Sequence, residues 1–395
     1  MTNAIDVVLV AAARTAQGKF RGALSALPST ALGSAAIAGA LERGGIAPAA
    51  VDAVLMGQVL PAGAGQNPTR QASIGAGLGW DVPTQGINKV CLSGLSAVID
   101  AARLIRLGDA TTVVAGGMES MTNAPHLLPH SRAGYGYGSI EVLDHLLHDA
   151  LHDPYDDVVM GLATERHNER FGISREQQDA VAVRSHERAA AAAEQGLFDA
   201  EIVPVDVPQR RGEPVAFARD EGVRPGTTLE TLAGLRPAFA DGGTLTAGNS
   251  SQISDGAAAV VLTTRANADA QGWEVLATVG AAGQVAGPDN SLQAQPARAT
   301  VAALERAGLR AADLDVMEIN EAFGAVVAQS QKELGLPDDV VNPRGGGISL
   351  GHPVGASGAR LVVTAAHQLV ERGSGTAAVA LCGGGGQGDA LILTR

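Results

Sequence analysis

Residues 40–46 read ALERGGI, and residues 303–309 read ALERAGL. A short apolar run follows each copy, VDAV at residues 51–54 and LDVM at residues 314–317. The offset, from 40 to 303 and from 52 to 315, is 263 in both cases. Each copy is typical of a helix end, a short loop and a buried strand. Chance similarity in an alanine-rich sequence is the alternative, but the shared Ala-Leu-Glu-Arg and the constant offset favour an internal duplication.

The resemblance between the two halves continues downstream. Ser93-Gly94 opens a helix-like stretch that leads to the apolar run at residues 112–117, and Ser357-Gly358 opens another that leads to residues 377–382. Near-continuous apolar strands that alternate with helices predict an α/β fold rather than an antiparallel sandwich. Two such halves placed back to back would bring their equivalent loops together, so we expect a site at their junction.

An insert of different character separates the halves. We expect residues 1–122 to form an N-terminal half, completed by about residues 251–270, and residues 271–395 to form a C-terminal half. Residues 123–250 would be an inserted loop domain that covers a ligand cleft. A metal site is one explanation for its histidines, but without tight ligand spacing surface or hydrogen-bonded histidines are favoured. They are His126, His130, His145, His148, His152, His167 and His186.

Composition narrows the functional class. With 395 residues the chain can bury two or three cores, and its net charge of −13 argues against nonspecific binding to nucleic acid or anionic membranes. Two cysteines cannot form a disulfide framework or a four-thiolate zinc site. Residues 1–10 have no basic segment before their apolar run, so we predict a buried strand rather than a signal peptide. No apolar run approaches a membrane span, and a reducing cytoplasm is the expected location.

Three reactive side chains lie in glycine-rich turns. Cys91 lies in NKVCLSGL at residues 88–95, His352 in GHPVGASG at residues 351–358, and Cys382 in ALCGGGG at residues 380–386. The amides at a helix N-terminus favour negative charge, so we expect a lowered pKa for the Cys91 thiol, with Lys89 nearby adding to its reactivity. A nucleophilic thiol, a histidine and a second thiol indicate acyl-transfer chemistry.

These segments, together with several others in the same order, resemble the thiolase family over nearly the whole chain, and within it the acetyl-CoA acetyltransferase group. The other segments are AART at residues 12–15, MGQVL at 56–60, GGMESM at 116–121, TAGN at 246–249 and NEAF at 320–323. The resemblance implies a duplicated five-layered α-β-α-β-α fold with an inserted loop domain. It also implies a homodimer or homotetramer, no tightly bound cofactor, and acetyl-CoA and acyl-CoA thioesters as substrates.

By the same resemblance, Cys91 takes the acyl group, His352 deprotonates it, and Cys382 removes a proton from the second acetyl thioester. His352 and a water held by Asn320 would stabilise the enolate oxygen, and the backbone N–H groups of Cys91 and Gly384 would form a second oxyanion hole. The residues expected to contact the substrate and its coenzyme A moiety are Arg224, Ser251, Met160, Phe323 and Ala247.

Alternatives remain at this point. A longer-chain degradative 3-ketoacyl-CoA thiolase would share these motifs, and Val159 and Leu292 stand where short-chain biosynthetic members usually carry histidine and methionine. A fatty-acid-type condensing enzyme usually pairs one cysteine with two histidines, or with a histidine and an asparagine, which the second cysteine argues against. A non-catalytic acyl-CoA-binding protein would not need Cys91, Asn320, His352 and Cys382 together.

Overall fold

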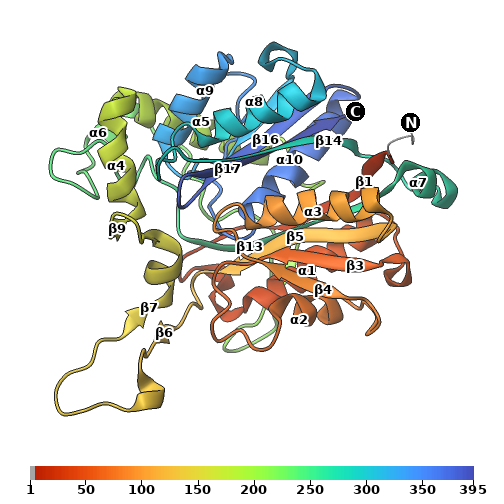
Figure 1. Ribbon diagram of the computed structural model, residues 1–395, viewed down its shortest axis with the longest axis horizontal. Helices are drawn as coiled ribbons and strands as arrows, with labels where there is room; N and C mark the ends of the chain where they lie inside the picture. The colour runs from red at the N-terminus through yellow and green to blue at the C-terminus, as the bar shows by residue number, and fades with distance from the viewer. Residues whose placement is uncertain (1–4) are drawn as a thin grey trace.

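The main sheet of the protein runs through both halves of the chain. The computed structural model describes residues 5–395 (Figure 1). The strands follow the order β15-β16-β17-β14-β1-β13-β5-β3-β4. Their bounds are β1 Val7–Thr15, β3 Ala53–Gly57, β4 Thr84–Ile87, β5 Thr112–Ser120, β13 Ser254–Thr264, β14 Ala277–Ala286, β15 Val316–Ile319, β16 Thr376–Gly383 and β17 Gln387–Thr394. Two short strands pair with the ends of central strands, β2 Gly18–Lys19 with the start of β13 and β10 Ile202–Val203 with the end of β1.

Each half of this order repeats the other. In the N-terminal half, β3 is parallel to β5, which is antiparallel to β13, which is antiparallel to β1. In the C-terminal half, β15, β16, β17 and β14 pair in the same sequence of directions. The halves meet where β1 pairs with β14 through Val8 with Thr278 and Leu9 with Ala277. The sheet order therefore has the two-fold pattern that the sequence duplication predicts.

The repeated segments form the same elements in both halves. Helix α1 (Ser29–Arg43), a 3₁₀ turn at Pro48–Ala50 and β3 follow one another in the first copy. Helix α8 (Gln295–Ala307), a 3₁₀ turn at Ala311–Asp313 and β15 follow one another in the second. The helix end, the loop and the buried strand expected from each copy are thus present.

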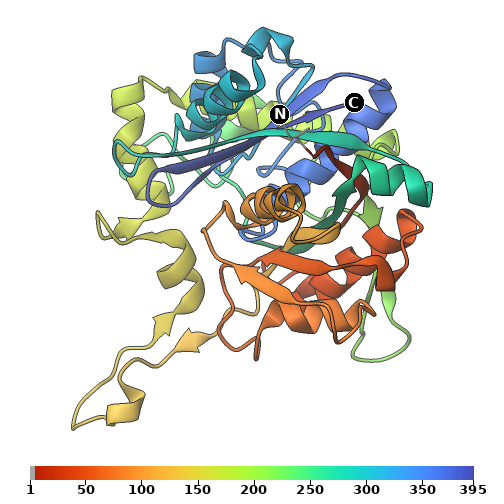
Figure 2. The same cartoon turned by 45° about the vertical axis from the view of Figure 1, so that its right-hand side comes forward.

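Helices and sheet halves alternate in five layers (Figures 1 and 2). Helices α1 and α2 (Pro68–Gly75) cover the outer face of the N-terminal half of the sheet. Helices α8 and α9 (Gly324–Leu334) cover the outer face of the C-terminal half. Between the two sheet halves lie α3 (Ser93–Leu107) and α10 (Ser357–Arg372), which pack against each other. This arrangement confirms the predicted duplicated α-β-α-β-α fold.

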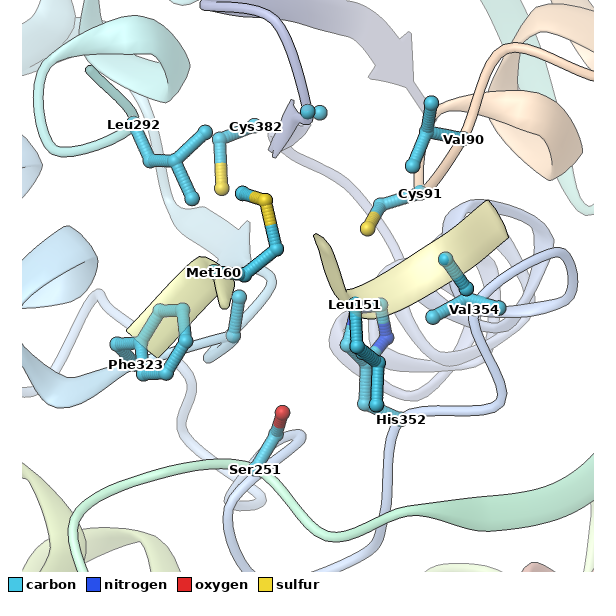
Figure 3. Close-up of a pocket in the computed structure, with 14 residues that line it drawn as sticks. Val90, Cys91, Leu151, Met160, Ser251, Leu292, Phe323, His352, Val354 and Cys382 are labelled. Atoms are coloured by element: carbon cyan, nitrogen blue, oxygen red, sulfur yellow. The ribbon is translucent and has the colours of Figure 1, made fainter. Parts of the chain in front are cut away.

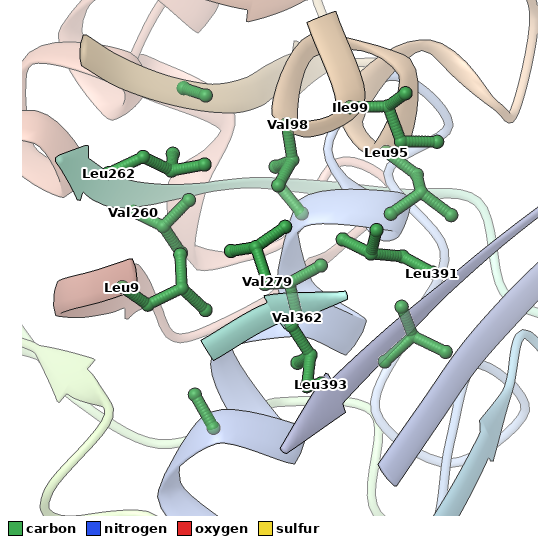
Figure 4. Packing of buried hydrophobic residues seen from close by; sticks show 14 of the residues in the cluster. Leu9, Leu95, Val98, Ile99, Val260, Leu262, Val279, Val362, Leu391 and Leu393 are labelled. Atoms are coloured by element: carbon green, nitrogen blue, oxygen red, sulfur yellow. The ribbon is translucent and has the colours of Figure 1, made fainter. Parts of the chain in front are cut away.

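The central layer holds a large aliphatic cluster. Leu9, Val260 and Leu262 from the N-terminal half meet Val279, Leu391 and Leu393 from the C-terminal half around α3 and α10 (Figure 4). All of these side chains are buried. Aromatic residues make up only 3% of the chain, and closely packed Ala, Val, Leu and Ile side chains fill this core instead.

The insert is less irregular than the sequence predicts. It contains two full helices, α4 (Met160–Phe171) and α5 (Arg175–Glu194), and α5 packs on α9. Ser174 and Gln177 form a capping box at the start of α5, and the alanine-rich sequence after it favours a helix. The other elements are short: β6 His126–Leu127, β7 Leu143–Asp144, a π-turn at Leu147–Leu151, β8 His152–Asp153, β9 Val158–Val159, β11 Val205–Val207, β12 Val215–Phe217 and α6 Leu229–Ala233. The boundaries proposed for the insert at 123 and 250 stay a prediction.

The N-terminal strand begins at Val7, so part of the strand predicted at residues 1–10 is present. Residues 1–4, which belong to the same prediction, lie outside the described residues. Helix α7 (Arg265–Gln271) links β13 to β14. Across residues 5–395, the structure has no helix with both the length and the apolar character needed to cross a membrane.

The central layer predicts where the fold is most sensitive to truncation. Leu95 of α3 is fully buried, whereas Leu107, at the end of the same helix, is 76% exposed. We expect Leu95→Ala to lower the free energy of unfolding by about 2–5 kcal/mol, because it removes packing and leaves a cavity. Leu107→Ala should change it by less than about 0.5 kcal/mol. Urea unfolding followed by circular dichroism measures both, and equal midpoints for the two variants would contradict the central position of α3.

Candidate active site

Cys91 lies in a tight turn just before α3. Val90, the preceding residue, has φ of +52°, a left-handed conformation that is unfavourable for a β-branched side chain. Side chains hold the turn in place. Val90 N–H donates to Asn88 Oδ1 at 3.0 Å, and the Ser93 hydroxyl donates to Val90 O at 2.6 Å while accepting from Lys89 N–H at 2.8 Å. Backbone strain that is fixed by its surroundings often marks a functional position.

The hydrogen bonds of His352 determine which ring nitrogen carries its proton. The Ser357 hydroxyl donates to Pro353 O at 2.9 Å, so it accepts from His352 Nδ1–H at 2.6 Å. Nε2 is therefore unprotonated, and it accepts a long 3.4 Å hydrogen bond from Asn320 Nδ2. The imidazole is neutral, with its free lone pair on Nε2, which is the form required of a general base.

Two glycines bring the turns of Cys91 and His352 together. A Cβ on Gly94 would lie 2.8 Å from Gly355 O and 2.9 Å from Ala359 N, and a Cβ on Gly358 would lie 2.4 Å from Leu95 N. No other residue allows such close backbone contact. The first turns of α3 and α10 therefore touch, and the loops that precede them open on the same space.

Cys382 reaches this space from the other side. It is the penultimate residue of β16, and the glycines at 383–386 turn the chain into β17. Its buried side chain packs with Leu292, Ala322 and Val326. The sulfur atoms of Cys91 and Cys382 face one cavity, which His352 also lines (Figure 3).

That inner cavity continues into a larger one. The inner cavity has a volume of about 50 Å³, and the outer cavity has a volume of about 590 Å³. Six residues line both of them: Leu151, Met160, Ser251, Phe323, His352 and Val354. The site therefore consists of a small reactive chamber behind a longer, mainly apolar approach, a shape that suits a long flexible ligand with its reacting group at one end.

Burial shifts the pKa values of the reactive groups toward their neutral forms. It raises the pKa of the Cys91 thiol to about 12, against the opposing effect of the backbone N–H groups of Cys91 and Gly384. Burial also raises the pKa of Cys382, with the nearby Cys91 adding to the shift, and lowers the pKa of His352 to about 4. The lowered pKa predicted for Cys91 is therefore wrong, because loss of solvation exceeds the effect of the helix N-terminus.

The contribution expected from Lys89 is also different. Its ammonium group is bound by the Asp389 carboxylate, at 2.7 Å and 2.9 Å from the two oxygens. Its charge is thus compensated by Asp389, and burial and the two N–H groups, rather than Lys89, determine the pKa of Cys91.

Comparison with known proteins agrees with this arrangement. Residues 7–266 match the family model described as "Thiolase, N-terminal domain", and residues 273–395 match "Thiolase, C-terminal domain". This chain belongs to the thiolase family. A protein of Mycolicibacterium smegmatis named "Probable acetyl-CoA acetyltransferase" is 53% identical to this thiolase over 388 residues, covering 98% of this chain and 100% of the relative. The "Acetyl-CoA acetyltransferase" of Cupriavidus necator is 48% identical over 390 residues, covering 99% of each.

The structure places most of the predicted site residues of this thiolase together. Met160, Ser251 and Phe323 line both cavities, and Ala247 lines the outer one. Phe323 also packs edge-on against Phe239, with ring centroids 6.2 Å apart. Asn320 is buried beside His352, and within residues 5–395 its Oδ1 has no hydrogen-bond partner. That oxygen is free to accept from a water molecule, as the prediction for Asn320 requires.

Arg224 does not join this group. It is exposed, it lines neither cavity, and its backbone N–H donates to His186 Nδ1 at 3.1 Å. Its contact with coenzyme A stays a prediction. The histidines of the insert also have ordinary partners, such as Asp157 for His152 and Asn290 for His167. In the part of the chain that the structure describes, no group of three or more His, Cys, Asp and Glu side chains could hold a metal ion.

Sequence reasoning missed two supporting residues. Ser357, which fixes the tautomer of His352, follows it by five residues at the start of α10, where a hydroxyl is also a common helix-start residue. Glu119 is buried behind the site, where it accepts from the N–H groups of Val59, Leu60 and Gly355 at 2.8–3.1 Å. Burial raises its pKa to about 7. It joins β5 to two loops, one at Val59 and Leu60 and one at Gly355, and a charged residue near the end of an apolar strand was its one visible signal.

The raised pKa of Cys91 can be tested by alkylation. Because the thiolate is the nucleophile, the rate of Cys91 alkylation by iodoacetamide should rise by about tenfold per pH unit between pH 6 and pH 9. Mass spectrometry of the labelled peptide separates Cys91 from Cys382, and Cys91→Ser provides the blank. A rate that is constant over this range would instead indicate a preformed thiolate–imidazolium pair.

Proposed function

We propose that this thiolase is an acetyl-CoA C-acetyltransferase, which catalyses the reversible Claisen condensation of two acetyl-CoA molecules to acetoacetyl-CoA and CoA through an acetyl-cysteine at Cys91. The observation that carries the proposal is the convergence of Cys91, Cys382 and His352 on one small chamber behind an apolar approach. The names of the two relatives at 53% and 48% identity support the same reaction.

The first half-reaction is acyl transfer to Cys91. His352 Nε2 takes the thiol proton as Cys91 Sγ attacks the thioester carbonyl, so both groups start neutral and charge develops only during the reaction. The N–H groups of Cys91 and Gly384, which hydrogen-bond to the resting thiol and lower its pKa, are the proposed donors to the oxyanion. Collapse of the tetrahedral intermediate breaks the carbon–sulfur bond to CoA, and His352 returns its proton to the departing thiolate.

The second half-reaction forms the carbon–carbon bond. Cys382 first gives its thiol proton to Nε2 of His352, and the resulting thiolate removes a proton from the methyl group of the second acetyl-CoA. The resulting carbanion attacks the acetyl group on Cys91. A thiolate is a weak base for this acid, so the enolate oxygen must be stabilised as it forms. His352 and a water on Asn320 are the proposed donors, and the contact between Asn320 and His352 supports their joint action. The Cys91 thiolate is the leaving group, and it regains its proton from the imidazolium of His352, which returns all three groups to their neutral forms.

The outer cavity suits the pantetheine arm of coenzyme A. Its wall is largely apolar and includes Phe239, Ile253 and Phe323, with Ser251 near the junction with the inner cavity. The proposal includes a homodimer or homotetramer in the cytoplasm with no tightly bound cofactor, whose small-molecule substrates are acetyl-CoA and acyl-CoA. Arg224, which lies outside both cavities, is kept as a contact for the distal end of coenzyme A.

A longer-chain degradative 3-ketoacyl-CoA thiolase is the second candidate. Leu292 lines the inner cavity, and Val159 lines the outer one. Both side chains are apolar, so they favour extra methylene groups more than polar side chains would. A non-catalytic acyl-CoA-binding protein is disfavoured, because the strained turn at Val90 and the fixed tautomer of His352 serve chemistry rather than binding.

Substitutions of the two cysteines should affect different half-reactions. Cys91→Ala should lose transfer of a radiolabelled acetyl group from acetyl-CoA, and with it both thiolysis and synthesis. Cys382→Ser should still become acetylated but should fail to condense, because a serine hydroxyl is a far weaker proton acceptor. Label on Cys382, or condensation by Cys382→Ser at the wild-type rate, would show that the roles are placed wrongly.

The apolar wall predicts the substrate range. We expect acetoacetyl-CoA and β-ketohexanoyl-CoA to be cleaved with comparable kcat/KM, because each buried methylene contributes about 0.8 kcal/mol in an apolar pocket. Thiolysis of both substrates by the wild type and by Leu292→Phe is the measurement, and the bulkier side chain should lower the rate for the longer substrate more. Rejection of β-ketohexanoyl-CoA by about a hundredfold or more would establish a strict short-chain enzyme.

A further inference from the structure

A buried ion pair connects the turn before Cys91 to the strand beside Cys382. Asp389 on β17 is fully buried, and its carboxylate accepts from Lys89 Nζ at 2.7 Å and 2.9 Å and from Ser96 Oγ at 2.8 Å. Gln284 on β14 adds two longer contacts of 3.3 Å. The Asp389 carboxylate, which belongs to the C-terminal half, is thus bonded to two places in the N-terminal half. One is Lys89 in the turn before Cys91, and the other is Ser96 in the first turn of α3.

The position of this pair bears on the oxyanion hole. Cys91 N–H lies two residues after Lys89. Gly384 N–H lies in the turn that joins β16 to β17. In that hairpin Asp389 pairs with Leu381, and the adjacent pair is Gly388 with Cys382. Asp389 is two residues beyond Gln387, the first residue of β17, or roughly 7 Å along the strand. The two donors are 293 residues apart in sequence, from 91 to 384, and the pair joins the segments that carry them.

The turn that carries the nucleophile, residues 88–91, has a strained backbone that neighbouring residues must support. Val90 is held at φ +52° between Lys89 and Cys91, so the turn carries strain that its neighbours must hold. Beside it, β16 lies close to an apolar side chain, since a Cβ on Gly383 would come within 2.7 Å of Leu92. Directional bonds from Lys89 to both carboxylate oxygens add a fixed spacing between the two segments.

We propose that Lys89 and Asp389 are positioning residues that set the distance between the two oxyanion-hole donors, Cys91 N–H and Gly384 N–H. This inference rests on the proposed acyl transfer to Cys91. The pair does not touch the substrate, and it acts through the backbone of the two turns. Its loss therefore affects the step in which a carbonyl oxygen becomes negative, and not the reactivity of the sulfur itself.

Two reactions of the same sulfur test this role. Acetylation of Cys91 by acetyl-CoA develops an oxyanion, whereas alkylation by iodoacetamide does not. The single-turnover rate of each is measured at one pH for the wild type, Lys89→Met, Asp389→Asn and the double variant Lys89→Met/Asp389→Asn. Lys89→Arg retains the charge, and Asp100→Asn breaks an exposed pair on α3 as the matched control. Peptide mapping assigns the label, and Tm is recorded for every variant.

We expect Lys89→Met to acetylate about tenfold to a hundredfold more slowly, in line with the cost of a small misplacement of catalytic groups. Its alkylation rate should stay within about threefold of the wild type, since a mispositioned oxyanion hole does not slow alkylation. Lys89→Arg should recover most of the acetylation rate, and Asp100→Asn should retain all of it. The double variant leaves no lone buried charge, so it should regain Tm while keeping the slow acetylation.

Wild-type acetylation by the double variant would overturn the positioning role. An equal loss in acetylation and alkylation would overturn it too, because the pair would then control the thiol or the stability of the fold. A wild-type enzyme that is alkylated but never acetylated would instead refute the proposed function, which separates the two failures.

Discussion

The close approach of helices α3 and α10, which Gly94 and Gly358 allow, is the constraint on which the rest of the structure depends. Each lies second in its helix, α3 or α10, and any side chain at either position would collide with the backbone of the other helix. Because the helices can touch there, one central layer serves both sheet halves. The loops before the two helices then open on one space. The stability of the core and the geometry of the site thus come from the same contact.

Burial of the site disfavours the charged forms of its reactive groups, and this explains why its hydrogen-bond donors are fixed in advance. Removing Cys91 and His352 from water keeps both of them neutral in the resting protein. Charge must then be created during the reaction, where it is stabilised by donors already in place rather than by reorganised solvent. The fixed tautomer of His352, the strained turn at Val90 and the carboxylate of Glu119, which bonds two loops, all keep those donors in place before the substrate arrives.

The repeat, the alternating elements and the three reactive residues were all readable in the sequence, because each has a local signature of spacing or turn chemistry. What the sequence could not provide was the balance of opposing effects. The helix N-terminus before α3 was visible and favoured a low thiol pKa, but burial exceeds it, and Cys91 packs against a cluster from distant parts of the chain that includes Met121, Leu146 and Val354. The partner of Lys89 was hidden for the same reason, since Asp389 is 300 residues away. Helix α5 was not predicted because the face that it buries carries polar side chains such as Gln178, Asp179 and His186, so its apolar periodicity is weak.

The two-fold pattern of the backbone is not matched by its side chains. With the offset of 264 that relates Ser93 to Ser357 and Thr112 to Thr376, the counterpart of Cys91 is Gly355, that of His352 is Asn88, and that of Cys382 is Met118. Each reactive residue therefore exists in one copy of the repeat alone. The counterparts make structural contacts instead, because Asn88 Oδ1 accepts from Val90 N–H and Gly355 N–H donates to Glu119. Duplication thus gave the protein one asymmetric centre whose opposite walls can diverge independently.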